Sequence, residues 1–100
     1  MKGFQLSSKE ELQLALEKVN YWDRIHKNKL LCKKQWEGPA RVLQDGISQI
    51  LSYYDEHLNY LCTMHRIVSK DGTAIVHEHV KDCYLNGVWY KAVDDKETTG

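Results

Sequence analysis

Four turn signals divide the second half of this sequence into segments of similar length. They stand at Asp45-Gly46, Asp55–Asn59, Lys70–Gly72 and Asn86-Gly87, so that a turn recurs about every 12 residues. The segments between them are rich in Ile, Val, Tyr and Thr, which favour strands. Turns at this spacing are typical of an antiparallel meander, in which each strand pairs with the next. We therefore expect strands through most of this half, centred on residues 59–92.

The region before residue 40 has a helical periodicity instead. Ser8, followed three residues later by Glu11, is a capping box that predicts a helix start. Apolar residues then recur at three- and four-residue steps, which predicts one amphipathic helix over residues 8–27 with a bend near Asn28. These residues are Leu12, Ala15, Leu16, Val19, Trp22 and Ile25. Trp36-Glu37-Gly38-Pro39 then predicts a turn, because a Gly-Pro pair cannot continue a helix.

The predicted fold is α+β, with the N-terminal helix packed on one face of a four- or five-stranded antiparallel meander. We expect a single domain over residues 1–93 and a flexible tail over residues 94–100, which are charged and small. Residues 2–6 are either an edge strand or an unstructured arm. Residues 38–54 also fit a second helix, because Val42, Ile47, Ile50, Leu51 and Tyr54 have helical spacing. Strands are favoured there because Gly46 follows Asp45.

The register of the central hairpin decides which side chains share a face. If Lys70-Asp71-Gly72 is a three-residue loop, His65 faces His77 and the apolar residues separate onto the opposite face. The first face then carries Leu61, Thr63, His65, Ile67, Ile75, His77, His79 and Lys81. The second includes Met64 and brings Arg66 next to Glu78. If the loop is only Asp71-Gly72, Arg66 faces His77 and the two faces are mixed. The clean separation favours the first register.

The last hairpin is set by Asn86-Gly87, which suits a two-residue type I′ turn. This turn pairs Leu85 with Val88, Cys83 with Tyr90 and Lys81 with Ala92. Side chains alternate along a strand, so we expect Tyr84 and Trp89 on the core side and Tyr90 on the histidine face.

Charge and cysteine content restrict the class of protein. Lys and Arg number 14, as do Asp and Glu, so the net charge is zero. A general nucleic-acid binder normally needs a basic surplus. No apolar run is long enough for a membrane span, and the first residues lack the apolar core of a signal peptide. Three cysteines, at Cys32, Cys62 and Cys83, form no CxxC pair. We expect reduced thiols and a cytoplasmic protein.

Our first hypothesis for function is a binding module without chemistry. Its exposed sheet face would carry His and Tyr residues, Tyr90 among them, and would bind a protein partner or a second copy of the chain. The basic run over residues 24–34 is the expected contact for an acidic surface or a phosphate backbone. Its binding residues are Arg24, Lys27, Lys29, Lys33 and Lys34.

Two alternatives involve the histidines directly. His65 and His77 as base and acid, with Lys81 steadying a phosphate, would suit RNA cleavage without a metal. Alternatively, His65, His77 and His79 would supply three nitrogen ligands to zinc or a similar divalent ion, which is the one cofactor the sequence suggests. A chelator, or the loss of activity in His77→Ala, would separate these alternatives from the binding module.

Overall fold

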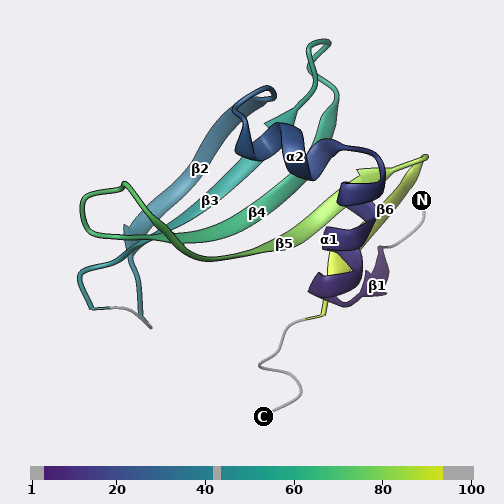
Figure 1. Ribbon diagram of the computed structural model, residues 1–100. Helices are drawn as coiled ribbons and strands as arrows, with labels where there is room; N and C mark the ends of the chain where they lie inside the picture. Colours follow the sequence, from purple (N-terminus) through teal and green to yellow (C-terminus); the bar gives the residue numbers. More distant parts are fainter. Residues whose placement is uncertain (1–3, 42–43, 94–100) are drawn as a thin grey trace.

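The computed structural model describes residues 4–41 and 44–93, and these form two short helices on one face of a six-stranded mixed sheet (Figure 1). The α+β class is therefore confirmed, but the sheet is larger than predicted. Its strand order is β1-β6-β5-β4-β3-β2, in which β2 to β6 form an antiparallel meander and β1 pairs in parallel with β6. The elements are β1 (Gln5–Ser7), α1 (Lys9–Lys18), α2 (Tyr21–His26), β2 (Leu31–Pro39), β3 (Ile47–Tyr54), β4 (Tyr60–Val68), β5 (Ile75–Leu85) and β6 (Val88–Ala92).

The predicted single helix over residues 8–27 is two helices. Its start is as expected, because Ser8 and Glu11 form the complete capping box. The break comes at Asn20, whose φ of 67° is left-handed. Asn tolerates this conformation better than most residues, so the chain turns here without glycine. A second left-handed residue, Asn28 (φ 57°), follows the end of α2.

The segment that contains Trp36-Glu37-Gly38-Pro39 is a strand and not the predicted turn. It forms the second half of β2, which pairs with β3 through Gly38 opposite Ser48 and Pro39 opposite Ile47. A proline is tolerated here because β2 is at the edge of the sheet. Gly38 is required for packing, since a Cβ atom there would lie 2.5 Å from the indole of Trp36.

The strand interpretation of the following region is confirmed where the structure describes it. Residues 47–54 are β3 and exclude the second helix, and Asp45 before them is left-handed in a turn (φ 64°). Val42, which belonged to the helical alternative, lies outside the described residues, and so does the predicted tail at residues 94–100. The remaining turns, at residues 55–59, 69–74 and 86–87, lie where the sequence predicts them.

The register of the central hairpin differs from the prediction by two residues. His65 lies opposite His79, and His77 lies opposite Ile67. The difference arises because Ser69 pairs with Ala74 across the turn, and because an irregularity at Ile67/Val68 leaves an extra residue, Val76, in β5. A shift of two preserves the faces, so the three histidines still point to one side. Ile75 and Leu61 leave the predicted histidine face, because Ile75 pairs with Val68 before the extra residue and Leu61 belongs to the core cluster. The predicted contact between Arg66 and Glu78 is confirmed.

A second bulge reverses the faces at the far end of β5. Met64 pairs with Val80 but Thr63 pairs with Asp82, so Lys81 is the extra residue and does not pair with Ala92 as predicted. The turn at Asn86-Gly87 and the pairs that follow from it are confirmed. The predicted faces are wrong, because Cys83 is buried and Tyr90 packs against the core. Tyr84 and Trp89 point to the other side.

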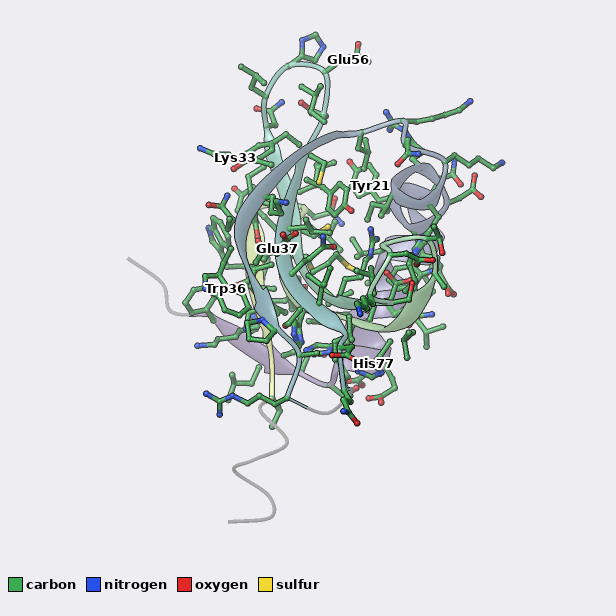
Figure 2. The ribbon with its side chains drawn as sticks, turned by 90° about the vertical axis from the view of Figure 1, so that its left-hand side faces the viewer. Tyr21, Lys33, Trp36, Glu37, Glu56 and His77 are labelled. Atoms are coloured by element: carbon green, nitrogen blue, oxygen red, sulfur yellow. The ribbon has the colours of Figure 1, made fainter. Side chains whose placement is uncertain are left out.

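The hydrophobic core lies between the helices and one face of the sheet, called the inner face below. Figure 2 shows β2 curving around the helices, with Glu37 on the inner side and Lys33 and Trp36 on the opposite, outer face. The core cluster is Leu12, Leu16, Ile25, Leu30, Leu51, Tyr53, Leu61, Cys62, Met64, Val80 and Cys83. No helix among the described residues is long and apolar enough to cross a membrane.

Candidate functional site

The three predicted histidines come together on the outer face, at the middle of β4 and β5. The rings of His65 and His79 lie edge to face with centroids 5.2 Å apart, and those of His77 and His79 are 5.7 Å apart. They share this face because Met64 and Val80, their neighbours in the chain, point into the core. The cluster was found by sequence alternation alone, although its partners across the hairpin were misassigned.

The environment of His65 and His79 favours the neutral form of both rings. Ser48 Oγ lies 2.6 Å from His65 Nε2, and burial lowers the pKa of His65, helped by the charges of Lys81 and His77. Burial also lowers the pKa of His79 to about 4, with smaller contributions from nearby cationic groups. These groups are His65, Lys9, His77 and Lys81. Within the described part of the chain, the buried His79 Nδ1 has no hydrogen-bond partner.

The structure adds little to the catalytic and metal hypotheses for this cluster. His77 is exposed, and Lys81 is exposed on the bulge close enough to act on His65 and His79. Within residues 4–41 and 44–93, no group of three or more His, Cys, Asp or Glu side chains is arranged to hold a metal ion. RNA cleavage by His65, His77 and Lys81, and zinc binding by His65, His77 and His79, stay predictions.

A chain of hydroxyl groups continues the outer face beyond the histidines. Tyr60 donates a hydrogen bond of 2.9 Å to Asp82 Oδ1, and its oxygen also contacts the hydroxyl of Thr63. Thr63 contacts Ser52 at 3.0 Å. Ser52 is buried although both described helices lie on the other face, so the network satisfies polar groups that are shielded from water. Burial and the Asp82 charge raise the pKa of Tyr60, which keeps it a neutral donor.

Aromatic rings form a continuous band across the outer face next to this network. We define the aromatic band as Phe4, Tyr54, Tyr60, Tyr84 and Trp89. Trp89 is its centre, with ring centroids 5.2 Å from Tyr60, 5.0 Å from Tyr84 and 6.0 Å from Phe4. Tyr54 extends the band through the contact of its ring with Tyr60. The sequence prediction missed this band because it placed Trp89 and Tyr84 in the core.

Much of the band is open to solvent, and its surroundings are basic. Phe4 is 51% exposed, Tyr84 and Trp89 are each 38% exposed, and neighbouring Leu6 is 72% exposed. Lys91 lies over the Phe4 ring at 5.8 Å. Lys33, Lys81 and Lys91 are exposed on this face, and Asp82 is the one carboxylate among its outward-pointing strand residues in the described chain. That carboxylate is engaged by Tyr60.

The predicted basic run does not form one surface. Arg24 lies in α2, and Lys27 and Lys29 follow this helix. Lys27 pairs with Asp23 at 3.1 Å. Lys33 and Lys34 alternate in β2, so Lys33 points outward and Lys34 points inward, where it binds Glu37 at 2.8 Å. A phosphate backbone could not contact all five side chains on one face. Tyr90, the other predicted contact, packs against the core cluster.

The inner face carries an ion-pair network that the sequence revealed in part. Glu78 accepts a hydrogen bond from Arg66 Nε at 3.0 Å through one oxygen, and its other oxygen lies 2.5 Å from His26 Nε2. His26 Nδ1 lies 2.7 Å from the carbonyl oxygen of Trp22. Both ring nitrogens of His26 therefore face acceptors. His26 is 52 residues from Glu78, so no local pattern could have predicted this contact.

Comparison with known proteins gives no relative from which a function could be transferred. No family model matches the chain, and no curated protein or solved structure matches it. Only the two faces of the sheet therefore indicate what the protein does.

Proposed function

We propose that the protein is a binding module whose outer sheet face docks a protein partner through the aromatic band. The observation that supports this most is the run of mutually contacting rings around Trp89, three of which are more than one third exposed. Clustered Trp, Tyr and Phe side chains supply large apolar area at low entropic cost and are enriched where proteins bind one another. The rings already support one another, so docking needs little reordering.

The chemistry of the face favours a partner that is acidic at its rim. Three lysines point outward here, and the single carboxylate of the face is used internally by Tyr60. A second copy of the chain would bring lysines against lysines, so self-association through this face is disfavoured. An acidic partner gains from the same charges and is steered toward the band.

Strand addition at the sheet edge is a less suitable mode of binding. The edge strand β2 carries Lys33, has a bulge between Lys34 and Trp36, and ends in Pro39. Each of these features discourages another strand from pairing with an edge. The partner is therefore expected to contact side chains of the face and not the backbone of β2.

A matched pair of variants tests this proposal. Trp89→Ser removes the centre of the band, whereas Leu14→Ser removes a more exposed apolar side chain (57% exposed) from α1. Proteins retained from a cell extract by the immobilised wild-type chain would be identified and purified, and their affinity measured by calorimetry. We expect Trp89→Ser to weaken binding by roughly 30-fold or more, as for a central aromatic contact, and Leu14→Ser to leave it unchanged.

The location of binding is checked on the same complex by amide hydrogen exchange. Protection is expected over residues 81–92, and binding should weaken as salt rises. The proposal fails if no purified protein binds, or if every partner binds Trp89→Ser as tightly as wild type. Binding of a labelled single-stranded oligonucleotide to the wild-type chain but not to Trp89→Ser would replace the protein partner with nucleic acid.

A further inference from the structure

A pocket opens on the inner face beside α2, on the other side of the sheet from the aromatic band. Its volume is about 480 Å³, which lies within the usual range for small-molecule sites. α2 supplies Ile25 and His26, β4 supplies Arg66, and the turn between β4 and β5 closes one end. Its existence depends on the shortness of α2, which ends at His26 and leaves this part of the inner face uncovered.

The pocket contains a cation that is not fully paired. The Arg66 side chain is only 14% exposed, and its Nε–H is used by Glu78. Tyr53 also interacts with this guanidinium, but the buried Nη2 atom has no hydrogen-bond partner among residues 4–41 and 44–93. Glu78 does not supply that partner, since one of its oxygens accepts from Arg66 Nε and the other lies beside His26 Nε2. A buried, unpaired donor on a charged group is costly, so an acceptor that reaches Nη2 from the pocket would gain more than at an ordinary surface arginine.

The acidic residues of the pocket are, in contrast, already paired. Glu37 accepts hydrogen bonds from Lys34 at 2.8 Å and from Gln49 at 3.0 Å, which hold the pKa of Glu37 below its ordinary value. Asp71 accepts from Ser69 and Thr73 within its own turn. Lys70 adds a further cationic side chain to the lining. The unmet requirement of the site is therefore for an acceptor with negative charge.

The remaining lining selects the kind of anion. Ile25, Ile47, Val68 and Ile75 give the pocket an apolar wall. Two carboxylates in the lining, Glu37 and Asp71, would repel a doubly charged phosphate more than a singly charged group. A carboxylate also matches the planar fork of a guanidinium.

We propose that this pocket binds a small organic carboxylate with an apolar body, whose carboxylate pairs with Arg66 and whose body lies against the isoleucines. This site does not depend on the proposed docking surface, because the two lie on opposite faces and share no residue. Glu78 and His26 hold the guanidinium in place, so they are positioning residues that need not touch the ligand.

The test uses octanoate as the probe, with octanamide as the uncharged ligand of the same length and inorganic phosphate as the bare anion. Binding is measured by calorimetry and by NMR, following the guanidinium resonances of Arg66. We expect octanoate to bind the full chain and to shift those resonances. Octanamide and phosphate are expected to bind roughly 10- to 100-fold more weakly, since each lacks one of the two matched features.

Variants then assign the binding to Arg66. Arg66→Met alone leaves Glu78 without its main partner and could unfold the chain, so the informative variant is Arg66→Met/Glu78→Gln, which removes both charges together. It should lose octanoate binding, while Lys33→Met, which removes a cation from the outer face, should bind as wild type does. Octanoate binding that is undetectable in wild type, unchanged in the double variant, or equalled by octanamide or by phosphate would overturn the proposal.

Discussion

The two faces of the sheet bury side chains in different ways. The inner face is sealed by α1 and α2 with aliphatic and sulfur-containing residues, and Met64, Cys62 and Val80 have no solvent exposure. Neither described helix covers the outer face, yet Ser48, Ser52 and Ile67 are also buried there. There the polar groups satisfy one another through the Ser48–His65 contact and the hydroxyl chain that ends at Asp82. Stability is thus concentrated on the inner face, which leaves the outer aromatic rings free to contact a partner.

The largest expected effect comes from the core of the inner face. Met64→Ala leaves a cavity at a fully buried position, and we expect it to lower the free energy of unfolding by about 2–4 kcal/mol. Leu6→Ala on the outer face, where the side chain is 72% exposed, should cost no more than about 0.5 kcal/mol. Urea unfolding followed by tryptophan fluorescence measures both. Equal losses would mean that the outer face is a second core.

Acid is expected to lower the free energy of unfolding by a smaller amount, through a histidine on the outer face. The folded-state pKa of His79 is about 4, below the ordinary value of 6.5. Below pH 6.5 the unfolded chain therefore binds a proton that the folded chain does not. His79 therefore costs the fold nothing above pH 6.5, and the free energy of unfolding decreases as the pH falls from 6.5 toward 4. Because solvent screens this half-buried ring, we expect a loss of about 1–2 kcal/mol, less than the whole shift would give.

Unfolding measured between pH 7 and pH 4 checks this assignment. In His79→Gln the free energy of unfolding should fall less over that pH interval. Part of the decrease should remain, because the pKa of His65 is also lowered. The comparison is His77→Gln, which removes an exposed ring whose charge lowers the pKa of His79 less than burial does, so it should change the pH profile less than His79→Gln. If both variants change the profile alike, the buried position of His79 is not the cause.

The smallest expected effect is a difference in reactivity between the three cysteine thiols. Cys62 and Cys83 lie opposite each other on the inner face and are fully buried. Burial raises the pKa of both, that of Cys83 to about 11, so neither forms the reactive thiolate at neutral pH. Cys32 is exposed on β2. In native buffer we expect a thiol reagent to label Cys32 alone, and all three after unfolding, as read by mass spectrometry. Rapid labelling of Cys83 in the native protein would show that the inner face opens.

The sequence predicted those parts of the fold that depend on local chemistry. The capping box at Ser8 and the turn at Asn86-Gly87, with both residues left-handed, follow from what these residues do in short peptides, and both predictions were correct. The break at Asn20 was not predictable, because Val19 and Trp22 continue an unbroken helical pattern. For the candidate sites, alternation identified the histidine cluster and the Arg66–Glu78 pair. It could not identify His26 as the second partner of Glu78, since that contact joins a helix to a strand far along the chain.

What the sequence determined by itself was the class of fold, the order of its turns and the residues that alternate within each strand. The tertiary structure decided which face each alternating set occupies. The single extra residue at Lys81 places Cys83 and Tyr90 in the core and turns Tyr84 and Trp89 outward. Such a bulge is selected by the fit between β4 and β5 beneath the helices, and one added residue reverses every side chain beyond it. The aromatic band therefore exists because of tertiary packing, although all of its rings are visible in the sequence.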